Sequence, residues 1–263
     1  MKARLAYYPS AGALAILFLF PLVWSGYSSV RTPHGFGLAN YVNMMRYGEG
    51  IGHYLTNTIV VTVLTVAGTL VVSVLGGYAF GRFTFPGKNV LFLLTLAILM
   101  VPYPTILIPL YVLLGWLHLQ NSLIGLSIVL VMFQLPFATY MMRNSFEAVP
   151  REFEESALVD GCGTFGTLRR VLLPAVRPGL ITVGLFAFLS AWNEFFAALI
   201  LLNSTDKFTL PLAVVAMRGR TFGAIDYPTL QAGVTFMAIP CLILFLVLQR
   251  SYVRGFLTGA LRG

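Results

Sequence analysis

Long uninterrupted apolar runs constrain this chain more than any other feature. A helix needs about 20 apolar residues to cross the hydrocarbon core of a bilayer. Six runs of about that length lie near residues 5–30, 55–80, 89–115, 121–143, 177–202 and 231–250. They do not alternate between apolar and polar residues, as the strands of a membrane barrel do. The sequence therefore predicts an all-α polytopic membrane protein with six transmembrane helices.

The composition excludes an ordinary soluble domain. The chain is 58% hydrophobic and 10% charged, whereas soluble domains carry about 25% charged residues. Lys2 and Arg4 precede the first run in the manner of a signal peptide, but the run is long and lacks a small-residue cleavage site. We expect a retained helix, interrupted at Pro21.

The basic residues predict the orientation of the chain in the membrane. Lys and Arg accumulate in cytoplasmic loops. With both termini in the cytoplasm, 12 of the 17 Lys and Arg residues fall in inside segments, five of them between Arg143 and Arg177. We therefore interpret the net charge of +8 as a topology signal and expect no nucleic-acid partner.

Proline and polar residues inside the runs point to a bundle with a cavity. Pro102, Pro104 and Pro109 crowd the third run and Pro136 lies in the fourth, where each removes a backbone donor and favours a kink. Glu194 is the one acidic residue that we place inside a span. It marks either a functional site or a hydrogen bond to a neighbouring helix or subunit. The candidates for a substrate pathway are Tyr78, Tyr111, Gln134, Asn193 and Glu194.

A polar segment over residues 149–175 interrupts the apolar pattern. Pro150 suits a first helical turn, and the acidic residues that follow it, Glu154 among them, favour the positive end of a helix dipole. Gly161 suits the left-handed residue that ends a helix. Thr164 is a candidate N-cap of a second short helix, which we expect Pro174 to end. The segment therefore predicts a helix–turn–helix.

The two short helices have apolar faces. Phe153 and Ala157 are four residues apart, and Phe165, Leu168 and Leu172 recur on one face of the second helix. Such a pair either lies flat on lipid headgroups or inserts an apolar side chain, Phe165 or Phe153, into a groove on a partner protein. The mixed charges of the segment favour the partner protein.

At these residues the sequence resembles the inner-membrane permease subunits of bacterial ABC importers. Their signature is Glu-Ala-Ala, three residues, Gly, nine residues, Ile, one residue and Leu-Pro. This chain has Glu155-Ser156-Ala157, Gly161, Val171 and Leu173-Pro174 at the same spacing, with Ser156 for Ala and Val171 for Ile. Asp160-Gly161, Trp192-Asn193-Glu194-Phe195 and the tail Val253–Gly263 are similar to the carbohydrate-uptake branch, of the maltose and glycerol-phosphate type.

The resemblance implies a type I ABC importer permease fold and a domain organisation. Residues 1–50 hold the first transmembrane helix and an extracytoplasmic loop, 51–250 the permease core, and 251–263 a cytoplasmic tail. A coupling loop at about 145–176 docks on a separate ATPase. The residues implied in that contact are Glu155, Ser156, Ala157, Asp160, Gly161, Phe165, Leu168, Leu173 and Pro174, with Thr258 and Gly259 of the tail.

The resemblance also implies partners and a location. The partners are a second permease subunit, a dimer of ATPase subunits and an extracytoplasmic solute-binding protein, in a bacterial inner membrane. No cofactor is expected on this chain, because ATP and Mg²⁺ bind the ATPase. The segment 82–89 contains Gly87-Lys88, but it has Arg82 and Asn89 where a phosphate-binding loop needs Gly and Ser or Thr. Neither catalytic side chains nor a metal cluster gather in the sequence.

The segment 203–230 is long and of mixed charge for an outside loop. It carries Asp206, Lys207, Arg218, Arg220 and Asp226. We expect it to help receive the solute-binding protein, the alternative being an ordinary solvated loop.

Three other functions remain as rivals to half of a sugar importer. An ion-coupled secondary transporter usually has more intramembrane acids and a repeat of broken helices. A membrane-embedded enzyme needs clustered catalytic side chains. The only argument against a scaffold for other membrane proteins is the resemblance of the 149–175 segment to the coupling loop of importers.

Overall fold

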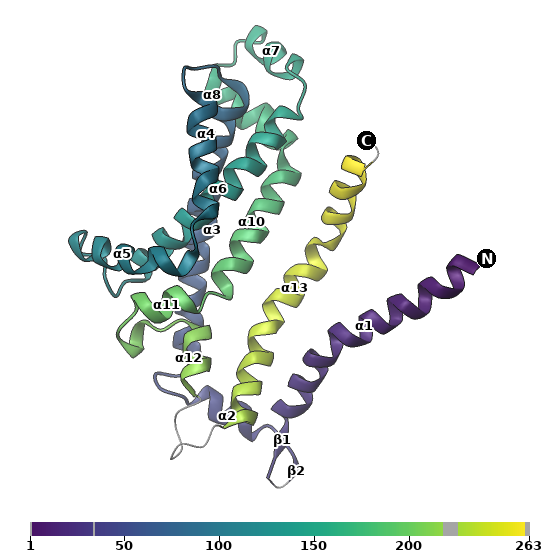
Figure 1. The fold of residues 1–263 in the computed structure, drawn as a ribbon, viewed down its shortest axis with the longest axis vertical. Helices are drawn as coiled ribbons and strands as arrows, with labels where there is room; N and C mark the ends of the chain where they lie inside the picture. The colour runs from purple at the N-terminus through teal and green to yellow at the C-terminus, as the bar shows by residue number, and fades with distance from the viewer. Residues whose placement is uncertain (1, 34, 218–225, 261–263) are drawn as a thin grey trace. The chain divides into compact units, whose positions relative to one another are not determined.

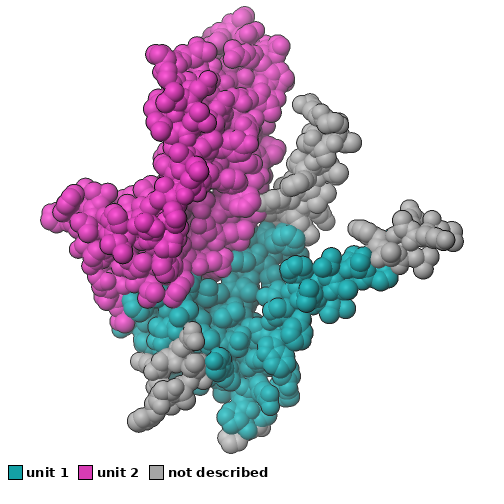
Figure 2. Space-filling model, in the orientation of Figure 1, with its two compact units in different colours: residues 1–56, 208–246 teal, residues 57–207, 247–263 magenta. Residues whose placement is uncertain are grey.

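The computed structural model of the chain describes residues 2–33, 35–217 and 226–260, with side chains for 8–33, 35–217 and 226–247 (Figure 1). The described residues are mostly helical, as the sequence predicts. The chain divides into two compact units, shown in different colours in Figure 2. One comprises residues 1–56 and 208–246, and the other comprises residues 57–207 and 247–263.

The first unit contains the N-terminal helix and most of the C-terminal one. Its elements are α1 (Lys2–Ser29), β1 (Arg31–Thr32), β2 (Gly35–Phe36), α2 (Ala39–Met45), α12 (Leu210–Ala216) and the first part of α13 (Tyr227–Ala260). The two-residue strands pair antiparallel. The Ser25 hydroxyl on α1 donates to Gln231 Oε1 on α13 at 2.7 Å, so polar side chains join these two apolar helices.

The second unit holds the rest of the membrane helices and the polar segment between them. It takes in most of α3 (Ile51–Arg82), then α4 (Lys88–Ala97), η1 (Ile98–Met100), α5 (Tyr103–Trp116) and α6 (Leu123–Glu147). The polar segment forms α7 (Glu152–Val159), α8 (Thr164–Thr167), the π-helical turn η2 (Leu168–Leu172) and α9 (Leu173–Ala175). Then come α10 (Arg177–Trp192), α11 (Phe196–Leu201) and η3 (Thr205–Lys207).

The membrane helices confirm the predicted class. Among the described residues, four helices are long and apolar enough to cross a bilayer: Tyr8–Ser29, Ile51–Arg82, Leu123–Glu147 and Tyr227–Val247. Two further stretches qualify only as bent pairs, Lys88–Met100 with Tyr103–Trp116 at 104° and Thr164–Ala175 with Arg177–Trp192 at 80°. The described residues therefore hold four to six spans.

In the described part of the third and fourth runs, the helix breaks at one of the predicted prolines. The third run breaks between Met100 and Tyr103, around Pro102. Helices α1, α5 and α6 instead continue through Pro21, Pro109 and Pro136. The prediction of an interruption at Pro21 was therefore wrong.

The fifth run is not the single helix that its length predicts. Helix α10 ends at Trp192, and α11 begins at Phe196 after a three-residue break. The Glu194 carboxylate accepts a hydrogen bond from the Ala197 N–H at 2.7 Å. It thereby satisfies one of the backbone donors that a new helix start leaves unpaired, so a side chain restarts the helix inside the apolar run.

Helices α3 and α6 pack at short range through glycine. A Cβ added at Gly77 of α3 would lie 2.5 Å from Met142 Cβ and 2.8 Å from Arg143 N, both on α6. At Gly68 it would lie 2.9 Å from Val131 Cγ2. Small residues let membrane helices approach closely and pack by van der Waals contact. The polar segment follows α6 directly in the chain, and its buried leucines pack against residues of both α3 and α6.

Candidate functional site

The polar segment 149–175, which we call the coupling loop after the contact that the resemblance implies, folds as the predicted helix–turn–helix. Helix α7 ends in a Schellman motif, in which Cys162 N–H donates to Ala157 O at 2.9 Å and Gly161 N–H to Leu158 O at 3.0 Å. Gly161 has φ +83°, the left-handed conformation that glycine adopts without steric cost. The prediction for Gly161 is confirmed.

One predicted helix start in the loop was wrong. Thr164 is the first residue of α8, and Gly163 is its N-cap. Helix α8, the π-helical turn η2 and α9 follow one another without a break, so the second short helix runs from Thr164 to Ala175. It ends one residue after Pro174, close to where the sequence predicts.

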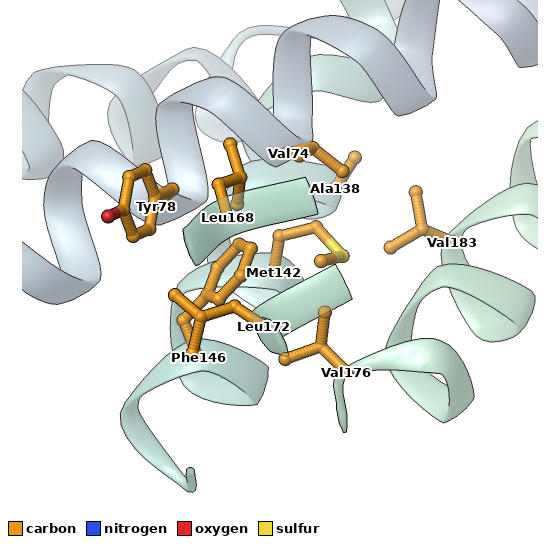
Figure 3. Packing of buried hydrophobic residues seen from close by; sticks show 9 residues of the cluster. All are labelled: Val74, Tyr78, Ala138, Met142, Phe146, Leu168, Leu172, Val176 and Val183. Carbon is orange, nitrogen blue, oxygen red and sulfur yellow. The ribbon is translucent and has the colours of Figure 1, made fainter. Parts of the chain in front are cut away.

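One face of the loop is anchored in an apolar cluster. Leu168, Leu172 and Val176 are buried, and they gather with Tyr78 of α3 and Met142 of α6 (Figure 3). The remaining members of this cluster are Val74, Ala138, Phe146 and Val183. The second half of the loop is therefore fixed to the membrane helices by side-chain packing.

The opposite face of the loop presents apolar side chains outward. Phe165 is 70% exposed and Phe153 is 55% exposed. The predicted shared faces were wrong, because Ala157 is buried while Phe153 is not, and Phe165 does not join Leu168 and Leu172. Phe165 precedes the π-helical turn, whose wider winding separates its direction from that of the two leucines.

The other residues predicted to contact an ATPase divide between these two faces. Glu155, Ser156, Asp160, Gly161 and Pro174 are exposed, and Leu173 is half-buried and packs against the apolar cluster. Thr258 and Gly259 belong to α13 by their backbone, and their side chains lie outside the described residues.

A polar junction joins the first half of the loop to α3. The Tyr78 hydroxyl donates to Glu154 Oε1 at 3.0 Å, and Arg82 Nε lies 3.5 Å from Glu154 Oε2. Arg82 Nη2 also donates to the carbonyl oxygen of Val149 at 2.7 Å. Sequence reasoning placed Tyr78 in a substrate pathway, whereas its hydroxyl lies under the loop. The four-residue spacing of Tyr78 and Arg82 at the end of a span is the signal that was available.

A second feature of the same unit is a cavity of about 350 Å³ beside the break in the third run. Its lining includes Gln134 and Glu194, two of the predicted pathway residues, with Tyr103 and Ser190. The other lining residues are Ile98, Leu99, Val101 and Phe133. The rings of Tyr103 and Phe133 meet edge to face, with centroids 4.5 Å apart. The cavity thus combines aromatic rings with amide, hydroxyl and carboxylate groups.

The remaining pathway candidates lie elsewhere. The Tyr111 hydroxyl accepts a hydrogen bond from Asn203 Nδ2 at 3.1 Å. The Asn193 amide donates back to Leu189 O of its own helix at 2.8 Å. The structure therefore brings together two of the five candidates.

The start of the 203–230 segment is tied to neighbouring elements of its unit. Asn121 Oδ1 accepts from the Asn203 N–H at 2.9 Å, and Asn57 Nδ2 donates to Asp206 O at 2.9 Å. The Ser204 hydroxyl, with Lys207 nearby, holds the pKa of Asp206 below its ordinary value. Asp226 caps α13 by accepting from Thr229 N–H at 3.1 Å. Arg218 and Arg220 lie outside the described residues.

The Gly87-Lys88 segment, compared with a phosphate-binding loop in the sequence, lies at the end of the turn between α3 and α4. Lys88 Nζ donates to Phe83 O at 3.0 Å, beside a hollow of about 370 Å³ lined by residues 84–90 other than Pro86. The described residues contain no group of three or more His, Cys, Asp or Glu side chains placed to hold a metal ion.

The sequence has a family match and curated relatives. Residues 73–256 match the family described as "Binding-protein-dependent transport system inner membrane component". The sulfoquinovosyl glycerol transport system permease protein SmoH of Agrobacterium fabrum is 32% identical, covering 97% of this chain and 92% of that protein. The diacetylchitobiose uptake system permease protein DasC of Streptomyces coelicolor is 36% identical, covering 80% of this chain and 75% of that protein.

The fold is similar to that of solved transporter chains. A chain of a bacterial ABC transporter involved in the import of the acidic polysaccharide alginate superposes with a TM-score of 0.84 and 22% identity, covering 95% of this chain and 96% of that one. A chain of a bacterial alginate ABC transporter in complex with its alginate pentasaccharide-bound periplasmic protein gives a TM-score of 0.72 and 15% identity, covering 94% and 93%. The helical arrangement is therefore that of an ABC importer permease.

Proposed function

Because this chain belongs to the family of binding-protein-dependent transport system inner membrane components, we propose that it forms half of the translocation pathway of an ATP-driven importer for a sugar or sugar-like solute. The chain is an integral membrane permease subunit with several apolar helices. In the proposed complex a second permease subunit supplies the other half of the pathway.

The observation that carries the proposal is the two-sided character of the coupling loop. One side is anchored by Leu168 and Leu172, which are 4% and 0% exposed, and the other side offers Phe165 at 70%. An exposed aromatic side chain on a rigid base is the usual form of an anchor that fills a partner's groove. The partner proposed is an ATPase subunit, with Glu155, Asp160 and Phe165 at the contact.

A sugar as substrate is supported by relatives and by chemistry. The names of SmoH and DasC refer to a sugar glycoside and a disaccharide. Sugar recognition needs aromatic surfaces and groups that pair with hydroxyls, held in a concave site. The cavity of about 350 Å³ supplies Tyr103, Gln134 and Glu194 among its lining residues. We propose that this cavity lies on the solute pathway.

The remaining assignments complete the proposed importer. A pair of ATPase subunits binds ATP and Mg²⁺, and this chain contributes no nucleotide site. Both termini and the coupling loop lie in the cytoplasm, as the distribution of Lys and Arg favours. The segment 203–230 faces an extracytoplasmic solute-binding protein. Residues Thr258 and Gly259 of the C-terminal tail make a further contact with the ATPase pair.

The test begins with purification of the chain from native membranes in mild detergent and mass spectrometry of what accompanies it. The expected result is a second permease subunit and an ATPase, and ATP-dependent uptake of a sugar after reconstitution of the complex with its binding protein. Gly161→Pro should remove the ATPase while the chain still inserts, because proline cannot adopt the φ of +83° found there. Recovery of the chain alone, under conditions that keep other importers intact, would contradict the proposal.

A further inference from the structure

Two buried side chains at one end of α3 reach the coupling loop. Tyr78 and Arg82 are four residues apart, so they lie on the same face of the helix. The Tyr78 ring packs against Phe83 and Phe146, with centroids 5.2 Å and 5.5 Å apart. The Arg82 side chain is 5% exposed. Both polar ends turn to one carboxylate, that of Glu154 on α7.

Arg82 holds the loop at two points. It donates to the carbonyl of Val149, just beyond the end of α6, and pairs with Glu154 within α7. The guanidinium group therefore links three segments: α3, the chain that leaves α6, and the helix that begins the loop. A planar guanidinium with several donors suits such a bridge.

The two halves of the coupling loop are attached to the membrane helices by different kinds of interaction. The second half is held by Leu168 and Leu172 in an apolar cluster, and apolar contact has no preferred direction. The first half is held by two charge-assisted hydrogen bonds, from Tyr78 to Glu154 and from Arg82 to the Val149 carbonyl, and by the Arg82–Glu154 ion pair at 3.5 Å. Such hydrogen bonds are directional and short-ranged. A buried guanidinium that loses its carboxylate is strongly disfavoured. Displacement of α7 must therefore carry the end of α3 with it.

We propose that Tyr78, Arg82 and Glu154 form the joint that passes movement of the coupling loop into α3, which makes Tyr78 and Arg82 positioning residues for coupling ATP hydrolysis to transport. This inference rests on the proposed function. Helix α3 continues without a break from Arg82 back to Ile51, a length of roughly 48 Å at 1.5 Å per residue. Displacement of the Arg82 end of α3 therefore moves a helix that is long enough to cross the membrane.

A matched control exists on the neighbouring helix. Arg143 Nε pairs with Glu147 Oε1 at 2.8 Å, and both residues belong to α6. This pair also joins an arginine to a glutamate, but it is more exposed than Arg82 with Glu154 and links two turns of one helix. Its loss changes local charge without separating two moving elements.

The experiment measures solute taken up per ATP hydrolysed in proteoliposomes containing the whole complex and its binding protein. Tyr78→Phe should lower this ratio roughly two- to tenfold, the factor expected for one hydrogen bond. Glu154→Gln should lower it by about tenfold, because a charged partner is lost. Glu147→Gln should leave the ratio unchanged. The amount of ATPase purified with each variant should equal that of the wild type.

Three results would overturn the joint. The first is that uptake and hydrolysis fall in equal proportion in the variants. The second is that Glu147→Gln lowers the ratio as much as Glu154→Gln does. The third is that Tyr78→Phe leaves the ratio unchanged. Tyr78→Phe keeps its ring packing, so its result decides the matter if Glu154→Gln fails to insert. Glu154→Ala removes the acceptor of the Tyr78 hydroxyl altogether, so the double variant Tyr78→Phe/Glu154→Ala should be no worse than Glu154→Ala alone.

The wild-type measurement separates this inference from the proposed function. A wild-type complex without an ATPase or without ATP-dependent uptake contradicts the importer itself. A wild-type complex that imports, with variants that keep the ratio, contradicts only the joint.

Discussion

Gly161 and Gly163 stand two residues apart in the same turn, and a Cβ at either would meet nothing within 4 Å. They differ in backbone conformation, since φ is +83° at Gly161 and −71° at Gly163. Gly161→Ala should therefore destabilise the turn by roughly 1–2 kcal/mol, the cost of the left-handed region for an L-residue. Gly163→Ala should be close to neutral. The readout is the affinity of the purified chain for its ATPase.

A third substitution separates conformation from size. Gly161→Asn adds a larger side chain than alanine, yet asparagine tolerates the left-handed region. Its affinity should lie between those of wild type and Gly161→Ala. If Gly161→Asn binds more weakly than Gly161→Ala, the effect comes from bulk at the interface and not from φ.

Substitutions at Phe165 and Leu168, three residues apart, distinguish an effect on ATPase binding from an effect on stability. Phe165→Ala should raise the Kd for the ATPase about 30-fold, corresponding to about 2 kcal/mol for an interface anchor. Its thermal unfolding should be unchanged, because the side chain is 70% exposed. Leu168→Ala should instead lower stability by about 2–5 kcal/mol, because it empties a buried position. Equal losses of stability in the two variants would contradict the assignment of the two faces.

The glycines of α3 test its contact with α6. Gly77→Ala places a methyl group against Met142 Cβ and the backbone of α6, and overpacking of this kind costs about 1–3 kcal/mol. A Cβ added at Gly52 on the same helix would meet nothing within 4 Å. Because alanine has a higher helix propensity than glycine, Gly52→Ala should leave the melting temperature unchanged or raise it slightly. Thermal unfolding in detergent measures both. A stable Gly77→Ala chain would mean that the two helices lie further apart.

Asn121 fastens the start of the 203–230 segment. Its Oδ1 accepts from the N–H groups of Asn203 at 2.9 Å and Ser204 at 3.3 Å, and its own φ is +49°. Asn121→Ala removes the acceptor, so hydrogen exchange at these two amides should accelerate about tenfold for each 1.4 kcal/mol lost. Asn121→Asp keeps the acceptor oxygen and should exchange much more slowly than Asn121→Ala.

Asp206 provides a pH test of the same region. The Ser204 hydroxyl, followed by Lys207, lowers the pKa of its carboxyl in the folded chain. A folded-state pKa below the unfolded one stabilises the fold above the unfolded pKa, and this contribution is lost as pH falls through the folded pKa. Ser204→Ala should raise the pKa of Asp206 toward its ordinary value in an NMR titration. An unchanged titration would mean that the Ser204 hydroxyl does not lower the pKa of Asp206.

The sequence predicts the elements of this fold better than their interruptions. Apolar run length is a property of the chain alone, so the membrane class and the position of the coupling loop were predictable. The break at 193–195 was not, because it depends on the Glu194 carboxylate reaching the Ala197 N–H. Pro102 interrupts a helix while Pro109 and Pro136 do not, which composition cannot distinguish.

The candidate site shows the same division. Gly161 was predictable because its conformation is local. The partners of Glu154 were not, because Tyr78 lies 76 residues away in the chain. A charge pattern identified Glu154 as a residue of a helix start, but only the three-dimensional structure shows which helix its side chain reaches.

The π-helical turn at Leu168–Leu172 has a consequence for insertions and deletions. A hydrogen bond that closes over five residues holds one residue more per turn than an α-helix does. Removal of a residue here leaves a regular helix that still reaches α9, but it turns everything upstream by about 100°. Phe165 would then point in a new direction while Leu172 stayed in place. The length of this turn, as much as its composition, sets the direction in which the exposed Phe165 side chain points.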